Sequence, residues 1–249
     1  MRFSRVLAAA IMAGALTFSA GCAATPPPVS EKVQQAYDQA QAKTPAANAG
    51  TPEVPIKFSE GTKTVFFGDS WTSGLYMNPV EKAYAYQVED KLGLDAEVMG
   101  GNGTGYLNAG PSNLGSYGQR FTALPVSDAK LLIIQGSVND FGRKLSDLGP
   151  AFDETLKLAR SKFPHAQIVV LGPAPAQWPA QPAIFTVNDI LHERSMNAGV
   201  AYISPYAESW INGENFSTMI DPATGHLSEA GHAHLASKVV EALKAKQAK

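Results

Sequence analysis

Short apolar runs and helix-like patterns alternate through most of this chain, and that alternation limits the folds it can adopt. The apolar runs are Thr64–Phe67, Ala96–Met99, Leu131–Gln135, Gln167–Leu171 and Val200–Ile203. Helical patterns occupy Val80–Leu92, Asp147–Phe163, Asn188–Asn197 and Ser228–Lys246. Strands that alternate with helices form a parallel sheet covered on both faces, and right-handed crossovers make that sheet doubly wound. The sequence therefore predicts an α/β protein, a three-layer α/β/α sandwich around a mostly parallel five-stranded sheet.

Two segments between these runs carry many glycines or prolines. Residues 111–124 include Gly115 and Gly118, which favour a loop over a helix. Residues 172–186 contain four prolines and follow the fourth apolar run. Long loops of a compact domain are often functional, so we expect this second loop to lie near a site at the carboxyl edge of the sheet.

The first 22 residues are organised like an export signal. Arg2 and Arg5 precede an apolar stretch, residues 6–18, that is too short to span a bilayer comfortably. Small residues then lead to Cys22, the single cysteine of the chain, as in a bacterial lipobox. We expect residues 1–22 to be a signal peptide and Cys22 to be a lipid attachment site. The alternative is an ordinary signal peptide with a chance cysteine.

The next segment, residues 23–56, is rich in Ala, Pro, Gln and Thr. Such a composition buries little apolar surface and predicts a flexible tether, with the folded domain at residues 57–249. The formal net charge is −2, and lysines and arginines form no block. We therefore expect no nucleic-acid partner, and the oligomeric state stays open.

Polar residues follow several of the predicted strands. The first strand runs into Gly68-Asp69-Ser70, the second into the glycine-rich segment 100–105, and the third into Gly136-Ser137-Val138-Asn139-Asp140. Ligands of open α/β sheets bind at the carboxyl edge, where these segments meet. A helix N-cap is the alternative role for Ser70, and an Asx-turn is the alternative role for Asn139. His226 precedes the last predicted helix, which Ser228 can cap.

Together these four segments, in this order over roughly residues 62–246, resemble the SGNH (GDSL-type) hydrolase family, whose fold is flavodoxin-like. The resemblance implies that Ser70 is a nucleophile and His226 its general base. It also implies an oxyanion hole formed by the N–H of Ser70, the N–H of Gly103 and the side-chain amide of Asn139. Gly101 is the second choice for the backbone donor. Asp69 is expected to be structural.

The partner of His226 is the open question of this resemblance. The family places an aspartate three residues before its histidine, where this chain has Ala223. The nearest upstream carboxylate is Asp221, and Pro222 and Gly225 can turn the chain back. We expect Asp221 to orient the imidazole. The alternative is a Ser–His dyad in which a backbone carbonyl takes that place.

His232 and His234 follow His226 closely, but residues two apart on a helix face different ways, and no cysteine or close carboxylate pair completes a metal site. We expect solvated histidines, no metal and no organic cofactor.

The resulting expectation is an exported carboxylic-ester hydrolase, lipid-anchored to the outer face of the bacterial membrane or cell envelope. Its expected substrates are acyl esters of small molecules, envelope glycans or lipids. An O-acyltransferase with the same triad and a catalytically inactive binding lipoprotein are the alternatives.

Overall fold

The computed structural model describes residues 54–248, so the expected signal peptide, Cys22 and most of the expected tether lie outside the described residues. Its main sheet has five strands in the order β2-β1-β3-β4-β5, and every neighbouring pair is parallel. The strands are β1 (Lys63–Gly68), β2 (Asp95–Gly100), β3 (Leu131–Gln135), β4 (Gln167–Leu171) and β5 (Ala201–Ile203). The predicted parallel sheet is confirmed, and each predicted apolar run lies in or overlaps one of these strands.

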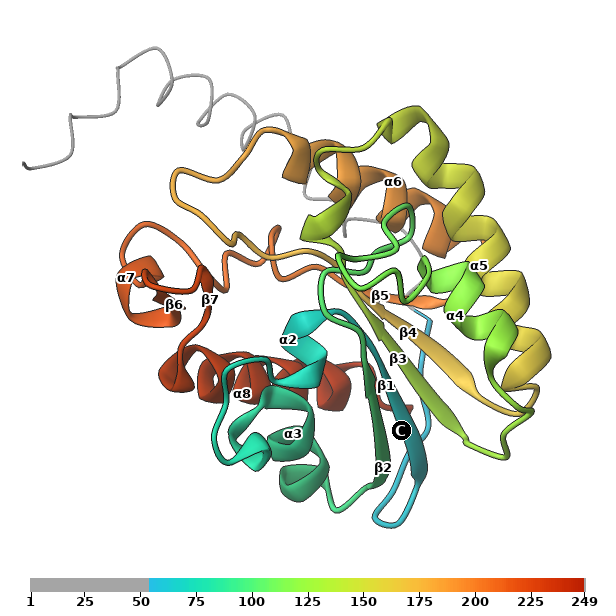
Figure 1. Cartoon of the computed structure of the whole chain (residues 1–249). Coiled ribbons are helices and arrows are strands. Elements are labelled where there is room, and N and C mark those ends of the chain that lie inside the picture. The colour runs from blue at the N-terminus through green and yellow to red at the C-terminus, as the bar shows by residue number, and fades with distance from the viewer. Residues whose placement is uncertain (1–53, 249) are drawn as a thin grey trace, which may run out of the picture. The chain divides into compact units, whose positions relative to one another are not determined.

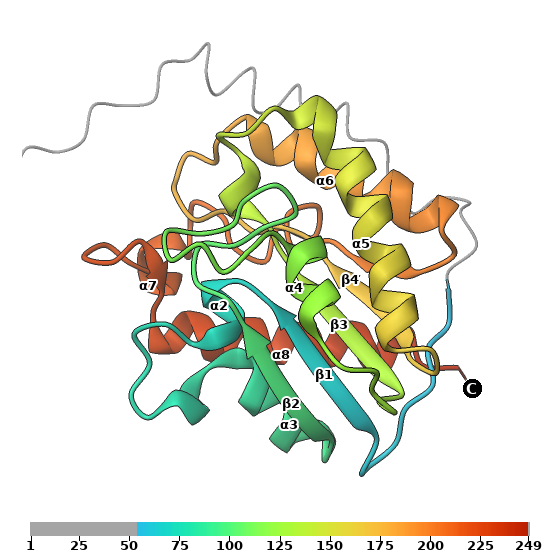
Figure 2. The ribbon, with the colours of Figure 1, turned by 45° about the vertical axis from the view of Figure 1, so that its right-hand side comes forward.

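Helices cover both faces of this sheet (Figures 1 and 2). One face carries α3 (Tyr84–Leu92) and α8 (Glu229–Ala245), and the other carries α4 (Tyr117–Ala123), α5 (Leu148–Lys162) and α6 (Ala183–Asn197). Alternate side chains of β1 enter the two layers: Phe66 packs with the α3–α8 layer, whereas Val65 and Phe67 pack with the α4–α6 layer. Burial on both faces explains why the strands read as continuous apolar runs. The three-layer α/β/α sandwich is therefore confirmed.

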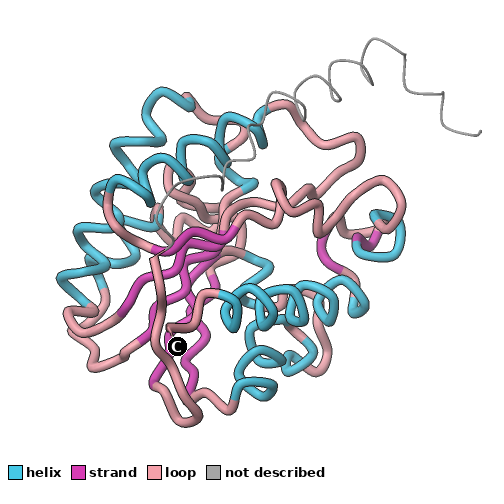
Figure 3. The backbone as a smooth tube through the Cα atoms, turned by 180° about the vertical axis from the view of Figure 1, so that it is seen from behind, coloured by secondary structure: helices cyan, strands magenta, loops and turns pink. Residues whose placement is uncertain are grey.

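Short elements connect the strands and helices at the carboxyl edge of the sheet. They are α2 (Ser70–Ser73), η1 (Val80–Lys82), η2 (Val138–Asp140), η3 (Leu145–Asp147), α7 (Phe216–Met219), β6 (Ile220–Asp221) and β7 (His226–Leu227). The last two strands form an antiparallel hairpin, which lies apart from the main sheet (Figure 3).

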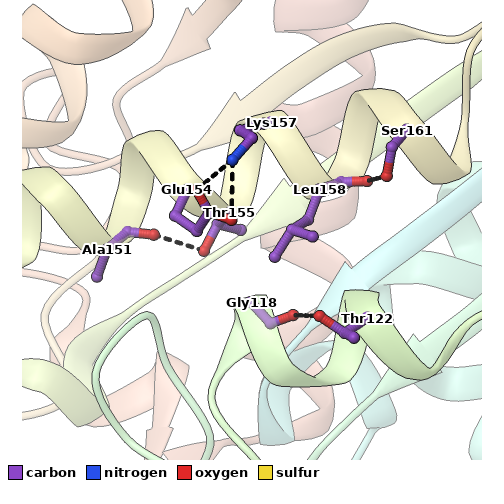
Figure 4. A network of polar contacts seen from close by, with 8 residues as sticks. All are labelled: Gly118, Thr122, Ala151, Glu154, Thr155, Lys157, Leu158 and Ser161. Carbon is purple, nitrogen blue, oxygen red and sulfur yellow. Dashed lines mark hydrogen bonds and ion pairs between the residues drawn. The ribbon is translucent and has the colours of Figure 1, made fainter.

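The segment expected to be a loop at residues 111–124 contains the helix α4. A capping box between Ser116 and Gln119 starts this helix, and it packs against α5 (Figure 4). Gly118 faces the second helix, because a Cβ placed there would lie 3.6 Å from atoms of Leu158 and Thr155. The hydroxyls of Thr122 and Thr155 bond to carbonyls of their own helices. These hydroxyls therefore do not link the two helices, which contact each other through close apolar packing. Gly118, which the sequence analysis took as a sign of a loop, lies within α4 at its contact with α5.

Two boundaries expected from the sequence also differ slightly from the structure. Ile56, assigned to the tether, is buried against the α3–α8 layer and forms backbone hydrogen bonds with Lys246 and Ala248. The helix α6 begins at Ala183, so it takes in the end of the proline-rich loop. Within residues 54–248, no helix has both the length and the apolar character needed to cross a membrane.

Candidate active site

Ser70 opens the short helix α2 immediately beyond β1. The carboxylate of Asp69 accepts a hydrogen bond from the N–H of Trp71 at 2.9 Å and so caps this helix. A side chain at Gly68 would collide with the hydroxyl of Thr72. Glycine therefore permits the tight turn from strand to helix. The turn leaves Ser70 nearly buried, with 6% of its surface exposed, and Trp71 packs in the core.

His226 reaches Ser70 from the β6–β7 hairpin at the other end of the domain sequence. Its Nε2 lies 3.1 Å from the Oγ of Ser70, and its Nδ1 lies 2.9 Å from the carbonyl oxygen of Thr224. A carbonyl can only accept a hydrogen bond, so Nδ1 carries the proton and Nε2 is free to accept one. Ser228 caps α8 just after the histidine by accepting from the N–H of Gly231 at 3.0 Å. The imidazole is thus held between a turn and a helix start, with its basic nitrogen directed at the serine hydroxyl.

Asp221 occupies a different place from the one expected for an orienting acid. It stands opposite His226 in the β6–β7 pairing, but its carboxylate accepts from the N–H of Ala223 at 2.9 Å and from the hydroxyl of Thr224 at 3.2 Å. The two additional residues between aspartate and histidine close a turn on this carboxylate. That turn directs the carbonyl of Thr224 at Nδ1, where a carboxylate was expected.

This geometry leads to a prediction for Asp221. We expect Asp221→Asn to lower kcat by less than about tenfold, because an amide oxygen can still hold the turn and the carbonyl of Thr224 still holds Nδ1. Loss of a true orienting aspartate can cost about 10⁴-fold. Esterase rates at matched thermal stability test this, with Glu229→Gln as the control, since Glu229 pairs with Lys82 at the surface. A loss of 10³-fold or more in Asp221→Asn alone would restore the carboxylate to the triad.

Asn139 lies on η2, just beyond the carboxyl end of β3. The hydroxyl of Ser137 accepts from its N–H at 3.1 Å and so caps this turn. The Asp140 carboxylate accepts from the N–H groups of Tyr106 and Leu107, both at 2.9 Å, and ties the turn to the glycine-rich loop. The backbone around Asn139 is therefore fixed on both sides.

The side-chain amide of Asn139 joins the glycine-rich loop, residues 100–105, to the turn that carries Ser70. Its Nδ2 donates to the carbonyl of Thr104 at 2.9 Å and makes a longer contact of 3.4 Å with Asp69. One N–H is therefore firmly engaged, whereas the other makes only a weak contact that a better acceptor can replace. This second N–H is the one suited to bind an oxyanion.

Hydrogen bonding distinguishes the two glycines considered as backbone donors. The N–H of Gly101 donates to the carbonyl of Gly68 at 2.9 Å and is therefore occupied. Gly103 has a φ of +71° in a turn, and among residues 54–248 its N–H has no hydrogen-bond acceptor. The neighbouring Asn102 accepts from the hydroxyl of Ser73 on α2 at 2.6 Å. The geometry therefore favours Gly103 as the backbone donor, on a loop that this hydrogen bond fastens to α2.

A buried polar network lies beneath Ser70. With its amide nitrogen turned toward these oxygens, Gln135 donates to Asp69 at 2.9 Å and to Thr72 at 2.8 Å. Thr72 also shares a hydrogen bond of 2.9 Å with Tyr84. Burial raises the pKa of Asp69 to about 7, against which the hydrogen bonds from Trp71 and Gln135 act. The network holds the nucleophile turn to β3 and α3, as expected for a structural Asp69.

Arg120 is a residue of this site that the sequence motifs did not reveal. From α4 its guanidinium donates to the carbonyls of Gly68 at 2.8 Å and Met99 at 2.6 Å, and to the hydroxyl of Thr104 at 2.9 Å. Its Cζ lies 4.1 Å from the centre of the Phe67 ring. One cation therefore ties together the ends of β1 and β2 and the glycine-rich loop.

The other histidines of the last helix differ from expectation. His232 is 1% exposed, and its Nδ1 accepts from the N–H of Tyr84 at 3.2 Å. Burial, reinforced by the charge of His226, lowers its pKa to about 4, so it stays neutral near pH 7. His234 is half-buried and contacts the carbonyl of Trp210 at 2.8 Å. Both are structural rather than solvated, and the described part of the chain holds no cluster of three metal-ligating side chains.

A small cleft of about 120 Å³ lies beside the turn that carries Asn139. It is lined by Val138, Phe141, Pro175, Ala176, Gln177, Gln181 and Ile184. Its walls come from η2, from α6 and from the proline-rich segment expected to be near the site.

The chain matches the model of the GDSL-like lipase/acylhydrolase family over residues 66–234. It is also 27% identical over 185 residues to a GDSL lipase of Mycobacterium tuberculosis, an alignment that covers 69% of this chain and 77% of that relative.

Solved structures with low sequence identity share the fold. A lipolytic protein of the G-D-S-L family from Desulfitobacterium hafniense has a TM-score of 0.59 at 14% identity, covering 73% of this chain and 99% of that one. The aryl esterase of M. smegmatis has a TM-score of 0.58 at 16% identity, covering 74% of this chain and 99% of that one. A carbohydrate esterase family 2 enzyme from Corynascus has a TM-score of 0.59 at 18% identity, covering 78% and 68%.

Proposed function

Because this chain belongs to the GDSL-like lipase/acylhydrolase family and is a serine ester hydrolase of the SGNH type, we propose that it cleaves carboxylic esters through an acyl-enzyme on Ser70. The single observation that carries this proposal is the 3.1 Å contact between the Nε2 of His226 and the Oγ of Ser70. A nucleophile within hydrogen-bond reach of a base, itself oriented by a third group, is the arrangement that covalent acyl transfer requires.

In the proposed first half-reaction, the Oγ of Ser70 attacks the acyl carbon while its proton passes to the Nε2 of His226. The carbonyl oxygen becomes an oxyanion, which the N–H groups of Ser70 and Gly103 and the amide of Asn139 stabilise. The first of these N–H groups lies in the first turn of α2, where an N–H has no acceptor within the helix. Collapse breaks the bond to the leaving oxygen, which takes the proton from His226.

In the second half-reaction, water attacks the acyl-enzyme and gives a proton to the same Nε2. Collapse breaks the bond between the acyl carbon and Oγ, the serine recovers its proton, and the carboxylic acid leaves. The imidazolium of His226 forms twice, and the carbonyl of Thr224 accepts its Nδ1–H each time. The proposal is thus a Ser–His dyad oriented by a backbone carbonyl.

We further propose that the cleft beside Asn139 receives the acyl group. Its volume of about 120 Å³ is below the ~300 Å³ at which ligand pockets commonly begin, so short acyl chains fit better than long ones. Release of p-nitrophenol and free acid from acetyl, butyryl and octanoyl esters tests both points. We expect the acetyl or butyryl ester to be preferred. A new ester in place of free acid would identify an acyltransferase, and no turnover of any ester would favour the inactive binding protein.

The location of the protein is a separate proposal that rests on Cys22 and the residues before it. We propose that the chain is exported and anchored by a lipid on Cys22, at the outer face of the bacterial membrane or in the cell envelope. Acyl groups on envelope glycans or lipids would then be within reach. We expect Cys22→Ser to move the protein from the membrane fraction to the soluble fraction and to abolish labelling by an alkyne fatty acid. An unlabelled, fully soluble wild-type protein would contradict this proposal.

A further inference from the structure

We infer that Tyr76 is a specificity residue of this esterase, which contacts a ring carried by the leaving alcohol; the inference rests on the function proposed above. Tyr76 belongs to the connection between α2 and η1, and 60% of its surface is exposed. Its ring packs edge to face on His226, with ring centroids 5.1 Å apart and an interplanar angle of 75°. A large, exposed aromatic ring thus lies directly against the catalytic base.

The backbone of Tyr76 is unusual for a residue of its size. Its φ is +72°, in the left-handed region that glycine and asparagine tolerate and that a tyrosine enters only at a conformational cost. The turn around it is closed by a hydrogen bond from the N–H of Met77 to the carbonyl of Gly74 at 2.9 Å. Glycine is the residue commonly found at such a turn position. Strained residues of this kind concentrate at functional sites. A glycine would relieve the strain at position 76 but would lack the aromatic ring, so we infer that the ring is the functional feature.

The same turn is anchored to the nucleophile. The N–H of Leu75 donates to the carbonyl of Ser70 at 3.0 Å, and the hydroxyl of Ser73 donates to that carbonyl at 3.1 Å. The position of Tyr76 is therefore fixed relative to both Ser70 and His226. Most of its ring remains open to an incoming molecule.

The chemistry of ester cleavage places the leaving alcohol beside this ring. The leaving oxygen takes its proton from the Nε2 of His226, so it must come within about 3 Å of that atom. The group attached to the oxygen then emerges next to the imidazole, where Tyr76 stands. The acyl group lies on the opposite side, toward Asn139. A ring in the alcohol, either an aryl ring or the C–H face of a sugar, can pack on the exposed tyrosine.

The test compares two acetates whose alcohols differ in a ring but leave as similar alkoxides, benzyl acetate and ethyl acetate. We expect Tyr76→Gly to lower kcat/KM for benzyl acetate by roughly three- to tenfold, the size of one aromatic contact, and to change ethyl acetate by less than twofold. Tyr76→Phe, which keeps the ring, should retain the wild-type ratio. An acetylated methyl glycoside, assayed alongside, shows whether a sugar ring gains as much from Tyr76 as an aryl ring.

Thermal stability separates this role from a structural one. Glycine suits the φ of this position, so Tyr76→Gly should keep or raise the melting temperature while it loses discrimination. An unchanged ratio of benzyl to ethyl acetate, or an equal loss for both esters, would overturn the inference while leaving the proposed function intact. Failure of the wild-type enzyme to cleave either ester would overturn both.

Discussion

Replacing Ser70 with alanine is expected to lower kcat for p-nitrophenyl acetate by about 10⁴-fold or more, the largest effect of any single change in this chain. The proposed acyl-enzyme needs an oxygen at this position, and removal of the nucleophile in another serine hydrolase costs about 10⁶-fold. The remaining rate would come from the oxyanion donors and from substrate binding alone. Among residues 54–248, the Oγ of Ser70 forms a hydrogen bond with His226 alone, so the fold should survive the change. Turnover and thermal unfolding, measured together, check both points.

Covalent labelling gives the same prediction a second readout. A fluorophosphonate probe should label the wild-type protein, and mass spectrometry should place the adduct on Ser70. Ser161→Ala is the matched control, because this serine lies on α5 and bonds to the carbonyl of Leu158 in its own helix (Figure 4). That variant should keep its turnover and labelling. Labelling that persists unchanged in Ser70→Ala would assign the nucleophile to another residue.

The main sheet could be predicted from the sequence because its strands are buried on both faces. Such strands appear as uninterrupted apolar runs, as Leu131–Gln135 does, and the helices between them carry a clear spacing of apolar residues. The helix α4 could not be predicted in the same way. It is short, it contains Gly118, and its capping box is supplemented by packing on α5. Packing of this kind is decided by tertiary structure, which local sequence does not report.

In the site, the side chains that stand in motifs could be predicted from the sequence, whereas the contacts to backbone groups could not. Ser70, Asn139 and His226 stand in recognisable motifs, because the chemistry that we propose for them depends on the identity of their side chains. The group that contacts the Nδ1 of His226 is a backbone carbonyl, and a carbonyl is present at every position of the chain. Its role depends on the turn that two additional residues create, so the sequence analysis named a carboxylate, Asp221, in its place. Arg120 was missed for a related reason, since it acts on backbone oxygens that no sequence pattern identifies.

The second large effect is expected for Asn139→Ala, which should lower kcat by about 10²–10³-fold, the usual cost of one oxyanion donor. The reason lies in the two N–H groups of this amide. One is held by the carbonyl of Thr104 at 2.9 Å, while the other makes only the 3.4 Å contact with Asp69. That second N–H can strengthen its bonding when charge develops on the substrate oxygen. An interaction gained in the transition state alone lowers kcat and kcat/KM together when it is removed, and leaves KM nearly unchanged.

Two further measurements separate this role from a structural one. Asn139→Asp keeps the shape of the side chain but places a carboxylate where the oxyanion forms, so it should lose at least as much turnover as the alanine variant. Asn108→Ala is the matched control, because Asn108 donates to the backbone carbonyl of Asn139 at 2.9 Å and supports the same turn from outside the reacting centre. If Asn139 only shaped its turn, Asn108→Ala would lose as much turnover as the alanine variant, and both variants would unfold at a lower temperature. A loss confined to the two Asn139 variants, with KM and melting temperature preserved, assigns the amide to the oxyanion.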